Sequence, residues 1–196
     1  MEQRIINIFH ESIEACMNAG ENLPPLLVSA SQSIVNALLN DKKIMCCGNG
    51  ISSAQAQILT SCLINRFEQE RPGLPALHLG ADVTTQTAIS RDYGLNDIYA
   101  KQLRSLGQAG DILVLISDQG KSSNLLQSIS AAHDKDIQVI ALTGADGGDI
   151  TTLLDHRDIE LRAPSNSMPR IHEIHLLSIF CLCDLIDQQL FGNQTD

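Results

Sequence analysis

The pattern of hydrophobic and polar positions divides the chain into short aliphatic segments and longer amphipathic ones. Five segments of four to six residues are rich in aliphatic side chains, at 43–47, 76–79, 112–117, 138–143 and 158–162. The first, third and fourth are almost continuously apolar, which is typical of strands buried on both faces of a parallel sheet. Segments with helical patterning lie between them, at 52–68, 96–106, 122–135 and 149–154.

This alternation predicts an α/β fold, a three-layer αβα sandwich with a five-stranded parallel sheet. For that sheet we expect the flavodoxin-like order 2-1-3-4-5, which would place the loops after the first and third strands side by side. Two helices are expected before the sheet, at 2–19 and 26–39, and a long one after it, at 168–190, ending before Gly192. We expect a single domain over residues 1–196, with 1–40 a helical pair for oligomerisation and 41–196 the α/β core. An apolar stripe on the first helix predicts a bundle or subunit interface. It consists of Ile5, Ile6, Phe9, Ile13 and Cys16.

Two loops have the composition of an anion-binding turn. "CGNGISS" follows the first predicted strand and "SDQGKSSN" follows the third, so both lie where open α/β sheets bind ligands. Glycines let backbone N–H groups approach an anion, and a following helix start and serine hydroxyls supply further donors. The candidate binding residues are Asn49, Gly50, Ser52, Ser53, Ser117, Gly120 and Ser122. Neither loop has the P-loop or GxGxxG spacing, so ordinary strand-to-helix turns with capping serines stay an open alternative.

Several longer stretches carry a more specific signal. "CCGNGISSAQAQ", "NRFEQERPGLPAL", "GLNDIYAKQLRSLGQAGDILVLIS", "IQVIALTGADGG" and "RIHEIHLLSIFCLCDLID" together resemble the SIS (sugar isomerase) domain family over essentially the whole chain. Within it they are similar to the phosphoheptose isomerase group and, most closely, to its members that associate with the replication initiator DnaA. The resemblance implies a SIS fold with leading helices and a homotetramer whose sugar-phosphate cleft lies between subunits.

The resemblance also implies where an isomerase would keep its metal and acid–base residues. Those positions fall on Ile58 and Cys62 of the first core helix and on His172 and Phe180 of the last. Aldose–ketose isomerisation moves a proton between adjacent carbons, and neither isoleucine nor phenylalanine can carry one. We therefore expect no catalytic residue, no metal and no cofactor. A metal site at Cys62, His172 and His175 is the alternative that the sequence leaves open.

The second loop also departs from the family pattern, which reads "STSGNS" where this chain reads "SDQGKS". Asp118 places a carboxylate where a hydroxyl would donate, at a cost to phosphate binding on the order of 1–4 kcal/mol. Lys121 offsets part of that cost. We expect the loops to retain a vestigial sugar-phosphate site without chemistry.

Charge and composition restrict the classes of partner. The net charge is −10, only 3% of residues are aromatic and there is no Trp, which argues against direct contact with nucleic acid. No apolar run of membrane-spanning length and no signal-peptide pattern is present, so we expect a cytoplasmic protein that does not bind membranes. The six cysteines lie in apolar surroundings and are interpreted as buried, reduced thiols.

The remaining candidate is a protein-binding surface at the end of the last helix. Leu190 and Phe191 are adjacent, and neighbours on a helix point about 100° apart, so both cannot easily face one core. We expect them to bind DnaA, with packing against the leading helices as the alternative. An isomerase with a rebuilt site and a sugar-phosphate sensor are the competing functions. His10, His78, His133 and His156 are interpreted as isolated structural or solvated residues.

Overall fold

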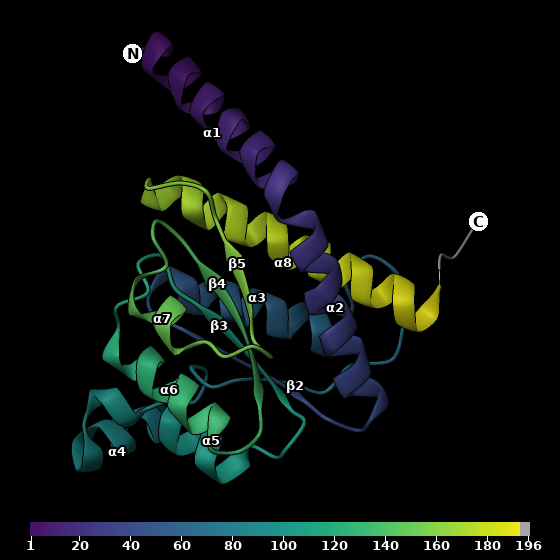
Figure 1. The fold of residues 1–196 in the computed structure, drawn as a ribbon, viewed down its shortest axis with the longest axis vertical. Coiled ribbons are helices and arrows are strands. Elements are labelled where there is room, and N and C mark those ends of the chain that lie inside the picture. The colour runs from purple at the N-terminus through teal and green to yellow at the C-terminus, as the bar shows by residue number, and fades with distance from the viewer. Residues whose placement is uncertain (193–196) are drawn as a thin grey trace.

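All five predicted strands are present in the computed structural model, which describes residues 1–192 (Figure 1). They form an all-parallel sheet in the order β2-β1-β3-β4-β5, as predicted. Their bounds are β1 Ile44–Gly48, β2 Ala76–His78, β3 Ile112–Ile116, β4 Gln138–Thr143 and β5 Ile159–Arg162. Strand order reverses between β1 and β3, whose carboxyl ends meet at Gly48 and Ile116.

Helices cover both faces of the sheet (Figure 1). One face carries α2 (Pro24–Leu39), α3 (Ile51–Ile64) and α8 (Met168–Phe191). The other carries α4 (Val83–Tyr93), α5 (Ala100–Leu106), α6 (Ser123–His133) and α7 (Gly148–Leu153). Every residue of β1 and β3 is buried, because alternate side chains enter the two hydrophobic cores. Thus Ile44 and Cys46 pack towards α2 and α3, whereas Met45 and Cys47 pack towards α5 and α6.

The largest differences from the sequence prediction are one missed helix and two helices with changed bounds. Helix α4 was missed, because its segment is rich in threonine and lacks an apolar stripe, although Asp82 caps it by accepting from Thr85 N–H at 3.1 Å. The helix predicted at 96–106 is divided into a 3₁₀ turn at Leu95–Asp97 and α5. Helix α3 ends four residues early, because the Arg71 guanidinium takes up the carbonyls of Cys62 and Leu63 at 2.8 and 2.9 Å.

Helix α1 (Glu2–Asn22) extends away from the sheet (Figure 1). Ala15 and Ala19 near its C-terminal end join the core shared with α2 and α8. Two side-chain hydrogen bonds also link it to α8: Ser12 Oγ donates to Glu173 at 2.7 Å, and Arg170 donates to the Ile8 carbonyl at 2.7 Å. Most of its predicted apolar stripe is exposed within the chain, with Phe9 65% exposed, and the role of the stripe in an interface stays a prediction.

Helix α8 is long and apolar enough to cross a membrane by length and composition. Yet 44% of its most hydrophobic window is buried, in the same core as α2 and α3. This is the pattern of a core helix that supports the sheet. It ends at Gly192, whose φ of 74° turns the chain and whose N–H donates to the Gln188 carbonyl at 3.0 Å.

All six cysteines are free thiols, as predicted, but only half of them are buried. Cys46, Cys47 and Cys183 are buried, whereas Cys16, Cys62 and Cys181 are partly exposed. Burial raises the pKa of Cys46 and Cys47 to about 12, so both thiols stay protonated and unreactive.

Candidate functional site

The two predicted loops meet at the carboxyl edge of the sheet, and a pair of amides, the partly buried Asn49 and the buried Asn124, joins them. Asn49 Nδ2 donates to Asn124 Oδ1 at 2.9 Å, and Asn124 Nδ2 donates back to Asn49 Oδ1 at 2.9 Å. The Tyr99 hydroxyl donates to the Gly48 carbonyl at 2.6 Å and holds the first loop from the α5 side. Sequence reasoning missed Asn124 and Tyr99, because their positions opposite Asn49 depend on the strand order.

The first loop places the start of α3 directly after β1. Gly48 is required there, since a Cβ atom would lie 2.7 Å from the Ser52 backbone, and Gly50 has a φ of 56°. No side chain caps this helix start. The Ser52 hydroxyl makes no hydrogen bond within residues 1–192, whereas the Ser53 hydroxyl contacts His78. The Ser52 and Ser53 N–H groups already donate to the carbonyls of Asn49 and Gly50, at 3.0 and 3.1 Å. The Ser52 hydroxyl is therefore the side-chain donor that this loop offers to an anion.

The second loop is closed by its own residues. Ser117 Oγ accepts from the Gly120 N–H at 3.0 Å, and Gly120, with a φ of 67°, lies against the Gly147 carbonyl where a Cβ would not fit. Ser122 occupies the N-cap position of α6 but makes no side-chain capping bond. The alternative of an ordinary capping serine is therefore not realised at Ser122, and its role in anion binding stays a prediction. Asp118 is half-buried beside these donors and Lys121 is exposed.

The isomerase positions do not hold a set of metal ligands. Phe180 stacks on Phe67, with ring centroids 5.8 Å apart, and Ile58 packs against the core. The Cys62 thiol lies beside Cys183. Burial raises the pKa of Cys183, and the neighbouring Cys62 raises it further, so Cys183 stays protonated. A phosphoheptose isomerase metal has only one imidazole and one thiol left at these positions, so the residues present do not fit it.

Two histidines lie on this part of α8: His172, at one of the four isomerase positions, and His175, three residues later. Each has one ring nitrogen within hydrogen-bond distance of a partner. His172 Nδ1 and Gln55 Oε1 are 3.0 Å apart, and Gln55 donates to the His172 carbonyl at 2.7 Å. His175 Nε2 donates to the Thr143 carbonyl at 2.8 Å, while its Nδ1 is buried without a partner in residues 1–192. Burial lowers the pKa of His175 to about 4, and burial also lowers the pKa of His172, with Asp118 opposing it. Both rings are therefore neutral near pH 7.

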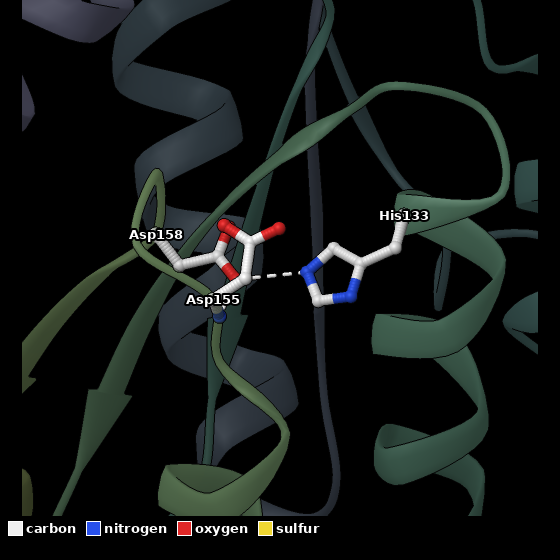
Figure 2. Close-up of side chains that lie close together, drawn as sticks. All are labelled: His133, Asp155 and Asp158. Carbon is white, nitrogen blue, oxygen red and sulfur yellow. Dashed lines mark hydrogen bonds and ion pairs between the residues drawn. The ribbon is translucent and has the colours of Figure 1, made fainter.

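The alternative metal site at Cys62, His172 and His175 is not assembled. Within the described part of the chain, one group of three donors is close enough to hold an ion: His133, Asp155 and Asp158 (Figure 2). Figure 2 shows His133 projecting from the end of α6 towards Asp158, to which its Nε2 donates at 2.8 Å. The expectation that His133 is isolated was wrong.

Protein donors already occupy the carboxylate oxygens of this group. Asp158 also accepts from the backbone N–H groups of Val139 and Asp155, each at 2.8 Å. Asp155 pairs with Arg157 at 3.2 Å. The group therefore fixes the loop that leads into β5 to the end of α6, far from the two candidate loops.

The structure separates the two residues predicted to bind a partner. Leu190 is partly buried and packs against the core that α8 shares with α2 and α3. Phe191 is 39% exposed, and the Arg71 guanidinium lies 5.9 Å from its ring centroid. Arg71 is held in turn by Asp187 at 2.6 Å, with both side chains buried. We call the exposed Phe191, together with the buried Arg71 against its ring, the α8 end surface.

Comparison with known proteins gives one fold, that of SIS domains, but relatives with two different functions. A family model described as "SIS domain" matches residues 9–144. The chain is 54% identical over 192 residues, 98% of each protein, to a phosphoheptose isomerase of Chromohalobacter salexigens. It is 47% identical over 196 residues, all of each protein, to the DnaA initiator-associating protein DiaA of Yersinia pestis. A solved phosphoheptose isomerase from Francisella tularensis has a TM-score of 0.92 at 45% identity, covering 95% of this chain and 97% of that one.

Proposed function

Because this chain belongs to the SIS domain family, we propose that it is a non-catalytic member that binds the replication initiator DnaA and promotes its multimerisation at the chromosomal origin. The proposal rests on one observation above all. The positions at which an isomerase of this family needs metal ligands and acid–base residues hold Ile58 and Phe180, both packed against apolar neighbours. The likeness to DiaA over the whole chain supplies the partner.

The chemistry of the cleft supports the absence of catalysis. Isomerisation requires a base and an acid whose pKa values lie near the working pH. His175 is buried and neutral with a pKa of about 4, so it cannot act as an acid near neutrality. His172 is neutral and can accept a proton, but the other position that the family uses on α8 holds Phe180, which stacks on Phe67 and carries no proton. A single imidazole without a metal does not make up the pair that the reaction needs.

DnaA binding is assigned to the α8 end surface. Phe191 is an exposed aromatic ring held in place by Arg71, and a fixed aromatic side chain loses little entropy when it enters a partner's pocket. Leu190, packed against the core, anchors the end of α8. A homotetramer would present four such surfaces and bring initiators together at high effective concentration. In this proposal the protein acts in the cytoplasm. DnaA makes the contact with DNA, and this acidic chain does not contact DNA directly.

Purified DnaA tests the proposal directly by pull-down or calorimetry. We expect wild-type protein to retain DnaA, and Leu190→Ala combined with Phe191→Ala to lose it. Leu177→Ala is a matched control, because Leu177 is an exposed aliphatic residue of the same helix. Absence of binding by the wild type would reject the function, and unchanged binding by the double variant would reject the surface.

The homotetramer is assigned to the helical pair at residues 1–40. The exposed stripe of α1, with Phe9 its most exposed aromatic member, is larger than a monomer usually leaves in water. Sedimentation should show a tetramer for the wild type and smaller species for Phe9→Glu. A wild-type monomer would contradict the assembly mechanism while leaving the DnaA contact testable.

The loops are assigned a retained anion site, which a sugar-phosphate sensor would share. The hydroxyls of Ser52 and Ser122 are free within residues 1–192, and the amide pair between Asn49 and Asn124 holds the two loops together. Thermal unfolding with sedoheptulose 7-phosphate measures this. A ligand at 100 times its dissociation constant stabilises by about 2.7 kcal/mol, and no shift at millimolar ligand would reject the site.

A further inference from the structure

His78, expected to be isolated, is instead the centre of a hydrogen-bonded chain that reaches the first candidate loop. Its Nε2 lies 3.2 Å from Ser53 Oγ and its Nδ1 lies 2.7 Å from Gln57 Oε1. Ser53 and Gln57 are four residues apart on α3, so they stand one above the other on one face of that helix. Gly80 leaves room for the ring, since a Cβ there would lie 2.6 Å from Nε2.

The acceptor on Gln57 fixes the direction of this chain. An amide oxygen can only accept, so His78 Nδ1 carries the hydrogen and Nε2 presents its lone pair. The Ser53 hydroxyl then donates to Nε2 and is turned away from the loop. With a neutral His78, Ser53 therefore offers an anion an oxygen lone pair instead of a proton.

Within the described residues, both hydrogen-bond partners of His78 are uncharged side chains. On β1 the adjacent Cys46 is a neutral thiol, because burial raises its pKa. The Asp82 carboxylate at the α4 N-cap accepts hydrogen bonds from the N–H and hydroxyl of Thr85. The Lys101 ammonium of α5 lies 3.2 Å from the centroid of the Tyr93 ring. Asp82 and Lys101 line the same cavity as His78, of about 360 Å³. Burial lowers the pKa of His78, so the ring is neutral until something favours its charged form.

This inference rests on the anion site proposed above. We propose that binding of a phosphate-type dianion at the first loop makes His78 take up one proton from solvent. The Ser53 hydroxyl rotates and donates to the anion, and the new Nε2–H of His78 donates to Ser53 Oγ in its place. No covalent bond between heavy atoms changes. The protonated ring also adds a positive charge near the ligand, which opposes the negative field of Asp118.

Linkage gives the sign of the effect. If the bound anion favours the charged imidazole, affinity rises as pH falls, by up to tenfold per pH unit between the two pKa values of His78. Calorimetry with sulfate, whose charge is constant between pH 5.5 and 8, measures this without titration of the ligand. Runs in two buffers of different ionisation enthalpy report the proton taken up at each pH.

Three variants separate this role from a merely structural one. Ser53→Ala should abolish both the pH dependence and the proton uptake, whereas Ser53→Thr, which keeps the hydroxyl, should retain them. Gln57→Glu should move the pH profile upward, because a carboxylate at Nδ1 favours the charged ring. Ser123→Ala, a first-turn serine of α6, is the matched control and should leave the profile unchanged.

The outcomes distinguish the two proposals. If neither sulfate nor sedoheptulose 7-phosphate binds at any pH, the anion site itself is refuted, and this inference with it. If sulfate binds with an affinity that is independent of pH and without proton uptake, the role of His78 is overturned while the site stands. A wild-type profile retained in folded Ser53→Ala protein would overturn it equally.

Discussion

The loops at the carboxyl edge of the sheet and the surface at the end of α8 are built in different ways. The loops depend on backbone geometry: glycines at Gly48 and Gly120, the start of α3, and an amide pair that joins them. The α8 end depends on side chains, namely a buried ion pair that positions an exposed ring. A site made from backbone survives the loss of its chemistry, because the same glycines are needed for the turns. Catalytic side chains have no such second use and can be replaced by apolar ones that pack better.

Breaking the ion pair under the α8 end should produce the largest effect. Asp187→Ala leaves the Arg71 guanidinium buried and unpaired, which costs about 3–5 kcal/mol of the free energy of unfolding. Chemical denaturation measures this. Arg66→Met is the control, since the pair of Arg66 with Glu70 is exposed and worth less than about 1 kcal/mol. Equal effects of the two variants would contradict the structural role of Arg71 and Asp187.

Acid should destabilise the fold through His175, beneath the loops. Its pKa is about 4 when folded and near 6.5 when unfolded, so the unfolded chain binds the proton first as pH falls. The contribution of neutral His175 to the free energy of unfolding is fully present above pH 6.5 and is lost as pH falls towards 4. The total loss is on the order of 3 kcal/mol. Stability curves between pH 4 and 7 should be flatter for His175→Gln. Parallel curves for the variant and the wild type would show that the ring is not buried as described.

Single substitutions of Leu190 and Phe191 should have different effects, one on stability and the other on DnaA binding. Leu190→Ala should lower the free energy of unfolding by about 1–2 kcal/mol, because the side chain is partly buried in the core. Phe191→Ala should cost less than about 1 kcal/mol but weaken DnaA binding at least tenfold, as an exposed anchor would. Denaturation and calorimetry on the same preparations compare them. The reverse assignment, with binding lost only in Leu190→Ala, would move the proposed contact to another face.

A smaller effect is expected in the loops. Asp118→Ser removes a negative charge beside the proposed anion site, which should raise the affinity for sulfate about fivefold, or about 1 kcal/mol. The effect is small because Asp118 is half-exposed and screened by solvent. Calorimetry at two salt concentrations checks it. A weaker affinity in the variant would mean that Asp118 contributes to binding instead of opposing it.

Much of the fold was predictable because buried strands and helix periodicity are local signals. The strand at Gln138–Thr143 was predicted with its observed bounds, and the expected sheet order 2-1-3-4-5 is the observed one. The end of α3 could not be predicted, because it depends on Arg71, which comes from the following loop. The candidate site shows the same limit. Its glycines and serines are visible in sequence, whereas the partnership of Asn49 with Asn124 and of Ser53 with His78 exists only once β1, β2 and β3 are side by side.

We propose that this chain does not catalyse isomerisation and that the α8 end surface binds DnaA. The most direct test is conversion of sedoheptulose 7-phosphate, followed by NMR at enzyme and substrate concentrations of the same order. We predict that the ketose phosphate stays unconverted over hours, while its NMR signals broaden or shift because it binds. Conversion to a heptose phosphate that His172→Ala abolishes would contradict it and identify the chain as an isomerase with a rebuilt site.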